Sequence, residues 1–408
     1  MKIAFFSAYP GFAGSQKMAL QLAVAARDAG LEAVAVAPGD WEYLQRAKQE
    51  GVESAVLPAP KGLLKFGKSA IQGSIFKKLS LVAFQLLPYN LKAARFFRKH
   101  GIDLVYAAQE RAVIEIGLGA KLARKPVLWH VQMGPVSNLN RIYKMCRKLA
   151  TRMICVSNAV AGGLNEALGR ESAPETSVIY NGIPDLPGGA PEYPLAAAGG
   201  ALKILFLGNI VPGKGPHHLI EAVGKLSASG ASVQLKIGGQ SRDEPFMEYL
   251  KSLRSGLDLE KSVEFIGFRD DIPELIEESD IVVCPSVESE RIENEFGVWN
   301  VDSKEGFCLV ALEAMRARRP VIASDSYGLK EVVAHGETGL RVPPGDAGAL
   351  FGALEQLAAD HALREKFGEA GRRRFEERFS LRNMTEKFVS AFNDMVPQKQ
   401  PSTNSAPS

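Results

Sequence analysis

Short, nearly continuous apolar runs alternate with longer amphipathic stretches along most of the chain. The runs are rich in Val, Ile and aromatic residues and are bounded by Gly, Pro or polar residues, a pattern typical of buried parallel strands. Met18, Leu22 and Ala26 repeat at every fourth position between two such runs, as in a helix. In the first half of the chain we expect strands over residues 2–8, 33–38, 103–108, 126–131, 153–157 and 177–181.

The alternation stops at a Pro-, Gly- and Ala-rich segment and then begins again. Strands are expected over residues 203–208, 233–239, 262–267, 280–286, 320–325 and 339–343. Two α/β units of this kind predict two Rossmann-like, doubly wound domains facing a cleft, and ligands bind such sheets beyond the carboxyl ends of the strands. The expected divisions are an N-terminal domain (1–183), a linker (184–201), a C-terminal domain (202–377), a last helix packing back on the N-terminal domain (378–396) and a disordered tail (397–408).

Composition narrows the class of protein. The 408 residues are 46% apolar and 23% charged, which is ordinary for a soluble globular protein and excludes collagen-like and disordered chains. No apolar stretch reaches about 18 residues, the N-terminus lacks a signal-peptide pattern, and the four cysteines form no C-x-x-C pair. We therefore expect a cytoplasmic protein with reduced thiols and no membrane span.

Charge is unevenly distributed. Residues 1–190 hold 24 Lys and Arg against 13 Asp and Glu (+11), and the remainder holds 25 against 33 (−8), which together give the net +3. Residues 54–102 contain no acidic residue, and their cations alternate with apolar residues, which predicts helices lying on an anionic membrane surface. The alternative is an ordinary solvated helix face. The cations assigned to membrane or acceptor contact are Lys61, Lys65, Lys68, Lys77, Lys78, Lys92, Arg95, Arg98 and Lys99.

Two glycine-rich turns follow predicted strands and precede helices, where free amides attract anions. One contains Gly14 and Ser15; the other contains Asn209 and Lys214, which glycines flank. Neither turn matches a dinucleotide fingerprint or a Walker A loop. Each can also be an ordinary loop without a ligand.

Residues 305–313 carry the most informative short pattern. Glu305 precedes a predicted helix whose first amides can bind an anion, and Glu313 lies among apolar residues, where a carboxylate needs donors such as sugar hydroxyls. The alternative is a glutamate that only stabilises a helix end. His130 ends another predicted strand, at the edge where doubly wound sheets bind ligands, although a lone histidine is often structural. Histidines and cysteines show no metal-ligand spacing, so neither a metal nor a cofactor is expected.

Taken together, these segments resemble the retaining GT-B glycosyltransferases of family 4, also called glycosyl transferases group 1. The resemblance covers about residues 1–380, and its pair of glutamates eight residues apart is the most specific element. The markers occur in the family's order: the glycine turn at 11–15, ICVSNAV at 154–160, VIYNGI at 178–183, FLGNIVPGKG at 206–215, VEFIGF at 263–268, DIVVCPS at 280–286, EGFCLVALEAM at 305–315, PVIAS at 320–324 and GETGLRVPPGD at 336–346.

The resemblance implies that the C-terminal domain binds a nucleotide-activated sugar and the N-terminal domain its acceptor. Catalytic roles fall to His130 beside the donor sugar, Lys214 at the leaving diphosphate and Glu305 at the sugar hydroxyls. Glu313 would hold the ribose. The other donor-binding positions implied are Gly14, Ser15, Asn209, Gly267, Phe268, Arg269, Gly306, Phe307, Cys308 and Leu309.

The function implied is metal-independent sugar transfer, with retention, to a glycan or lipid-linked acceptor at the cytoplasmic membrane face, in cell-envelope or exopolysaccharide synthesis. Three departures stand out: Asn209 replaces an arginine, Cys308 replaces a glycine, and the acidic residues 287–304 look inserted, as a lid or a partner surface. They leave open a non-catalytic, membrane-associated partner of another transferase. A GT-B epimerase or a NAD enzyme fits the residues less well.

Overall fold

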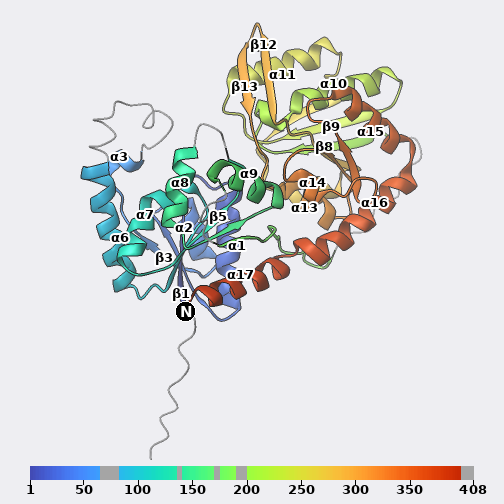
Figure 1. The fold of residues 1–408 in the computed structure, drawn as a ribbon. Coiled ribbons are helices and arrows are strands. Elements are labelled where there is room, and N and C mark those ends of the chain that lie inside the picture. The colour runs from blue at the N-terminus through green and yellow to red at the C-terminus, as the bar shows by residue number, and fades with distance from the viewer. Residues whose placement is uncertain (65–81, 136–139, 170–174, 190–199, 397–408) are drawn as a thin grey trace, which may run out of the picture.

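The computed structural model describes residues 1–64, 82–135, 140–169, 175–189 and 200–396. They form two α/β domains, each built on a parallel sheet with helices on both faces (Figure 1). The predicted fold class is confirmed by this architecture. The cations Lys65, Lys68, Lys77 and Lys78, much of the expected linker and the expected disordered tail 397–408 lie outside the described residues.

The N-terminal sheet has seven strands in the order β3-β2-β1-β4-β5-β6-β7. Its central strands are buried on both faces, which explains their continuous apolar sequence. The edge strand β3 was not predicted, because its four residues contain no apolar run. The strands are β1 (Lys2–Phe6), β2 (Glu32–Ala37), β3 (Glu53–Val56), β4 (Leu104–Ala107), β5 (Val127–Val131), β6 (Arg152–Cys155) and β7 (Glu175–Val178).

The C-terminal sheet has six parallel strands in the order β10-β9-β8-β11-β14-β15. The segment that looked inserted forms an antiparallel hairpin, β12–β13, which stands beside α11 at the top of Figure 1. The strands are β8 (Leu202–Leu207), β9 (Val233–Gly238), β10 (Val263–Gly267), β11 (Ile281–Cys284), β12 (Ser289–Asn294), β13 (Gly297–Asp302), β14 (Val321–Ser324) and β15 (Gly339–Val342).

Helices cover both sheets. In the N-terminal domain they are α1 (Gly14–Asp28), α2 (Glu42–Gln49), α3 (Lys61–Leu64), the π-helix η1 (Val82–Leu86), α6 (Leu87–Lys99), α7 (Glu110–Leu122), α8 (Asn140–Leu149) and α9 (Asn158–Leu168). The later ones are the 3₁₀-helix η3 (Pro212–Lys214), α10 (Pro216–Ala228), α11 (Glu244–Gly256), α12 (Ile272–Glu277), α13 (Leu309–Arg316), α14 (Leu329–Val332), α15 (Ala347–Ala359), α16 (His361–Arg374), the π-helix η4 (Phe375–Phe379) and α17 (Leu381–Met395).

The chain crosses between the domains twice, and the two crossings lie side by side. Ile183 accepts a hydrogen bond from the amide of Leu381 and donates one to the carbonyl of Phe379. Gly182 is required here, because a Cβ would lie 2.3 Å from the carbonyl oxygen of Ser380. After the second crossing, α17 packs on the N-terminal domain through Phe388 and its neighbours. The C-terminal helix therefore joins the core of the first domain.

Among the described residues, no helix combines the length and the apolar character needed to cross a bilayer.

Candidate functional site

Lys214 and Glu305 form an ion pair at the entrance to α13. Lys214 ends the short helix η3 after β8, and Glu305 lies four residues before α13 begins. Burial alone would lower the pKa of Lys214, but the carboxylate of Glu305 outweighs it and the net shift is upward. Lys214 is therefore a fixed cation at this point.

A second ion pair joins the two domains at the other end of this site. Lys17 Nζ on α1 lies 3.0 Å from Glu313 Oε1 on α13. Glu313 is only 7% exposed, so this cation offsets a charge that would otherwise be costly to bury. Close by, a Cβ on Gly14 would be 3.6 Å from Leu309 Cδ1, which places the first glycine turn against the start of α13.

Close backbone packing fixes the first turn of α13. A Cβ on Gly306 would lie 2.1 Å from the carbonyl oxygen of Gln132, and the Gly306 carbonyl accepts a hydrogen bond of 2.9 Å from Ser157 Oγ. Phe307 stacks on Tyr180 at 5.7 Å between ring centroids. The first amides of an α-helix have no acceptor within the helix, so this rigid start can bind an anion.

Cys308 stands where the family pattern has a glycine. Its sulfur lies 3.5 Å from that of Cys284, at the end of β11, and both residues are buried. The side chain thus points into the domain.

The remaining donor-side positions lie along one edge of the C-terminal sheet. Amides of Gly208 and Gly239 bond to the carbonyls of Gly238 and Gly267, so the ends of β8, β9 and β10 are adjacent. Asn209 follows β8 and is exposed. Exposed Phe268 follows β10, and Arg269 beside it forms an ion pair with Asp271. The cation described on this edge is Arg269, which is paired with Asp271, and binding of a base beside Phe268 stays a prediction.

His130 lies one residue before the end of β5, as predicted, and its role beside the donor sugar stays a prediction. Its side chain is 1% exposed and lies in the core, with Nδ1 2.5 Å from Tyr106 Oη and its ring against Phe388 of α17. Burial lowers its pKa to about 3, so the imidazole is neutral. Gln132, two residues further on, lies against Gly306 and accepts a hydrogen bond from Asn181. Gln132 Nε2 also lies 2.9 Å from His130 Nδ1, so His130 contacts the residue that lies against Gly306 of the other domain.

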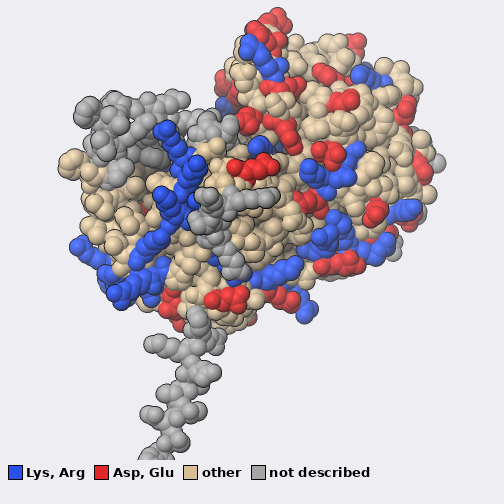
Figure 2. All heavy atoms as spheres, viewed as in Figure 1, with Lys and Arg blue, Asp and Glu red and all other residues tan. Residues whose placement is uncertain are grey.

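The basic surface lies on the N-terminal domain. Figure 2 shows Lys and Arg side chains in a band over the region of α6, α7 and α8. Of the predicted cations, Lys61, Lys92, Arg95, Arg98 and Lys99 are described, and all are exposed. Large apolar side chains are exposed on the same helices and on η1: Phe84, Leu87, Leu91, Leu118, Leu122 and Met145.

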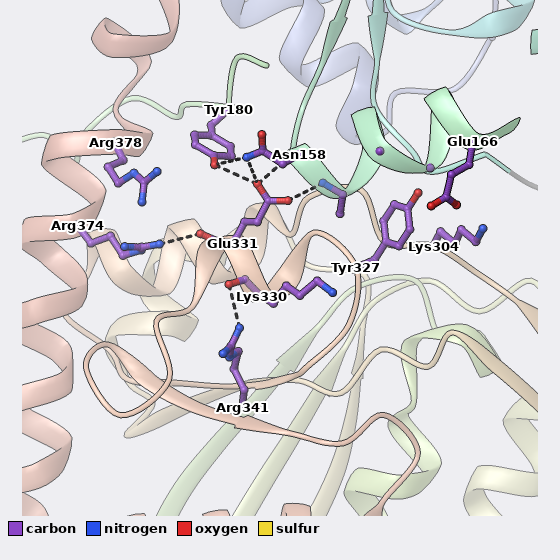
Figure 3. A pocket seen from close by; sticks show the side chains of 13 residues that line it. Asn158, Glu166, Tyr180, Lys304, Tyr327, Lys330, Glu331, Arg341, Arg374 and Arg378 are labelled. Carbon is purple, nitrogen blue, oxygen red and sulfur yellow. Dashed lines mark hydrogen bonds between the residues drawn. The ribbon is translucent and has the colours of Figure 1, made fainter. Parts of the chain in front are cut away.

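A pocket of about 700 Å³ lies where α9, α14 and the segment around η4 meet (Figure 3). Glu331 reaches from α14 to the start of α9 and accepts hydrogen bonds from the amides of Asn158 and Ala159, at 2.9 and 2.7 Å. Tyr180 Oη donates to the same carboxylate at 3.0 Å. Glu331 thus links the domains as a carboxylate at a helix N-terminus. The sequence analysis did not single it out, because only the fold brings α14 to α9.

Two protein-family models match the chain. The model described as Glycosyltransferase Family 4 matches residues 12–185, and the one described as Glycosyl transferases group 1 matches residues 194–374. Together with two doubly wound domains, these matches define a GT-B glycosyltransferase. Since they include most of both domains, the chain belongs to the GT-B glycosyltransferases of the family 4 type.

Curated relatives match part of the chain. An exopolysaccharide phosphotransferase of Streptomyces coelicolor is 31% identical over 58% of this chain and 22% of its own length. An alpha-D-kanosaminyltransferase of Streptomyces kanamyceticus is 33% identical over 41% of this chain and 39% of its own length. The chain thus spans well under half the length of these two relatives.

Solved structures match the chain over nearly its whole length. The Anabaena protein HepE in complex with UDP is 21% identical, with a TM-score of 0.76 over 97% of this chain and all of that chain. WaaG, a glycosyltransferase of lipopolysaccharide biosynthesis, is 16% identical, with a TM-score of 0.65 over 97% of this chain and all of that chain. At these identities the likeness shows the fold.

Proposed function

We propose that the protein transfers a sugar from a nucleotide-diphosphate sugar to a glycan or lipid-linked acceptor, with retention at the anomeric carbon. The observation that carries the proposal is the start of α13, with Lys214 and Glu305 at its entrance and Glu313 eight residues on. A diphosphate at the amides of Phe307, Cys308 and Leu309 would meet a helix N-terminus and a fixed cation. Those groups would take the place of a metal ion on the diphosphate.

The two glutamates suit the sugar and the ribose, the two parts of such a donor that carry neutral hydroxyls. Glu305 can accept hydrogen bonds from the sugar hydroxyls, and Glu313 from the ribose hydroxyls. Lys17 supports this arrangement from the opposite domain, since it reaches Glu313 at 3.0 Å. It is also a candidate for the cation that Asn209 does not supply. The leaving phosphate would then take the acceptor's proton, and trapping a covalent glycosyl-enzyme would contradict this mechanism.

The names of the relatives support a role in making surface polysaccharides. Besides the exopolysaccharide phosphotransferase, a capsular polysaccharide glycosyltransferase of Staphylococcus aureus and a lipopolysaccharide core glycosyltransferase of Rhizobium meliloti match about half of this chain. Since HepE was crystallised with UDP, a UDP-sugar is the first donor to test.

The test is slow hydrolysis and thermal protection with a panel of UDP-, GDP- and ADP-sugars. We expect one donor to raise the unfolding temperature of the wild-type protein and to be hydrolysed. Glu313→Ala should abolish the protection, because the ribose loses its carboxylate acceptor. Exposed Glu355 on α15 offers a matched control, and Glu355→Ala should behave as wild type.

Failure of every donor to bind would contradict the proposal. Tight binding of a donor without hydrolysis or transfer would instead favour the non-catalytic partner of another transferase. Equal protection of wild type and Glu313→Ala would show that the nucleotide binds elsewhere.

We also propose that the basic face of α6 lies on the inner surface of the cytoplasmic membrane, where a lipid-linked acceptor would reside. Exposed cations and exposed leucines on one helix support this, because anionic headgroups and acyl chains would meet both kinds of side chain. Each cation contributes about 1 kcal/mol at such a surface.

Replacing Lys92, Arg95, Arg98 and Lys99 with Gln should therefore lower partitioning onto phosphatidylserine vesicles by on the order of 100- to 1,000-fold. Four exposed cations of α16 and α17 provide the control with the same charge change: Lys366, Arg373, Arg382 and Lys387. Cosedimentation measures both variants. Equal loss in the two would indicate a net-charge effect and contradict a membrane face on α6.

A further inference from the structure

Three side chains with metal-binding atoms meet where the β12–β13 hairpin passes the start of α10. His217 Nε2 lies 3.1 Å from Glu290 Oε2, and His218 Nε2 lies 3.0 Å from Glu290 Oε1. Each of the three offers one such atom within 4.8 Å of the others. The histidines follow the Lys214 turn, whereas Glu290 comes 73 residues after His217, on the hairpin.

The two histidines of this cluster are buried and lie close together. His217 is 2% exposed and His218 9%, with their ring centroids 4.0 Å apart. Within the described part of the chain, the Nδ1 atoms of both rings lack a hydrogen bond, while each Nε2 lies beside an oxygen of Glu290. Two imidazoles and a carboxylate thus converge between α10 and β12.

Glu221 adds the arrangement that usually accompanies a ligating histidine. Its Oε2 lies 3.9 Å from His218 Nδ1, while Nε2 of the same ring faces Glu290. Metal-bound histidines generally present their second nitrogen to a carboxylate or carbonyl, which fixes the tautomer. Glu221 is thus placed to orient His218 without being a ligand.

We propose that His217, His218 and Glu290 bind a divalent transition-metal ion of the zinc type. Two imidazole nitrogens and one carboxylate oxygen are a common zinc ligand set and leave a fourth position for water. Magnesium and calcium prefer sites made of oxygen atoms alone. The expectation that no metal is bound came from ligand spacing along the sequence, which a site shared by two distant segments does not show.

The ion would link the hairpin to α10, the helix that follows the Lys214 turn. Two further contacts hold this segment: the amide of Val287, two residues before β12, bonds to the Gly213 carbonyl at 3.0 Å, and Trp299 of β13 donates to Asp243, which precedes α11, at 2.8 Å. The metal ion would thus hold the inserted segment in a fixed position against α10. This site is separate from the nucleotide site proposed above and does not depend on it.

The test uses untagged full-length protein, stripped with a chelator and desalted. After zinc chloride is added and the excess removed, we expect one zinc per chain by mass spectrometry and a higher unfolding temperature. Glu290→Gln and His218→Gln should lose this zinc, and Glu221→Gln should lower the affinity by about 10- to 100-fold. Glu293→Gln, an exposed change on the same strand, should bind as wild type.

Cobalt(II) gives a second readout. Visible absorption bands from a low-coordinate nitrogen–oxygen site should appear in wild type and Glu293→Gln and be missing in His218→Gln. Glu290→Gln keeps the size and polarity of the side chain, so it should remain folded by circular dichroism. Less than stoichiometric zinc in the wild type, or equal affinity in Glu290→Gln and wild type, would overturn the proposal.

Discussion

His130 shows what burial does to a single residue of this protein. Its imidazole is neutral in the folded chain because burial lowers its pKa from 6.5 to about 3. Below pH 6.5 the unfolded chain gains a proton that the native chain cannot take up. The contribution of His130 to the free energy of unfolding is therefore complete above pH 6.5. Between pH 6.5 and about pH 3 it falls by about 1.4 kcal/mol per pH unit.

We predict that His130→Gln reduces the loss of stability between pH 7.5 and pH 5 by about 2 kcal/mol. Urea unfolding at several pH values measures this difference, and carboxylates common to both proteins cancel in the comparison. The same loss of stability in His130→Gln as in the wild type would mean that His130 titrates normally in the native state.

The sequence pattern singled out several candidate residues but not their surroundings. Lys214, Glu305 and Glu313 were predicted because glycine turns and helix starts have local signals. The deep burial of His130 was not predicted, because a strand buried on both faces gives no alternation to show how each side chain is placed. Lys17 was missed, although it lies one helical turn after Gly14, because the pairing with Glu313 crosses 296 residues.

At the scale of elements, η3 and α13 act as one unit. Lys214, at the end of η3, pairs with Glu305, four residues before α13, which places the cation near the start of that helix. If the leaving diphosphate binds there, Lys214 matters most when negative charge grows on it.

We predict that Lys214→Gln lowers turnover by about 100- to 1,000-fold and donor affinity much less. Glutamine can still donate to Glu305, which limits any effect on folding. Lys225→Gln, an exposed change on α10, serves as the control. Initial rates and direct titration with the donor separate the two effects. Unchanged turnover in Lys214→Gln would remove Lys214 from the reaction.

The strands were the elements that the sequence predicted best. The contacts between distant segments were the hardest to predict. The expected runs fall within a few residues of twelve parallel strands, because buried strands need continuous apolar sequence. The hairpin β12–β13 was visible only as an acidic insertion. Exposed and partly buried residues alternate along the hairpin. Its position beside α10 and α11 depends on Glu290 and Trp299, which pair with distant residues.

At the scale of the whole molecule, the site depends on how the domains meet. Glu331 at the start of α9, the paired crossings at Ile183 and Ser380, and the Lys17–Glu313 ion pair all join the two domains. The two-domain class followed from the alternation of strands and helices. The way the two domains contact each other could not be predicted, because every one of these contacts joins residues far apart in the chain.

The central claim is that a nucleoside diphosphate binds at the start of α13. A crystal structure of the protein with the diphosphate that protects it best against heat tests this most directly. We predict the diphosphate within hydrogen-bonding distance of the amides of Phe307, Cys308 and Leu309 and of Lys214, with the ribose hydroxyls on Glu313. A nucleotide bound elsewhere, with Lys214 still paired to Glu305 and this space empty, would contradict the account.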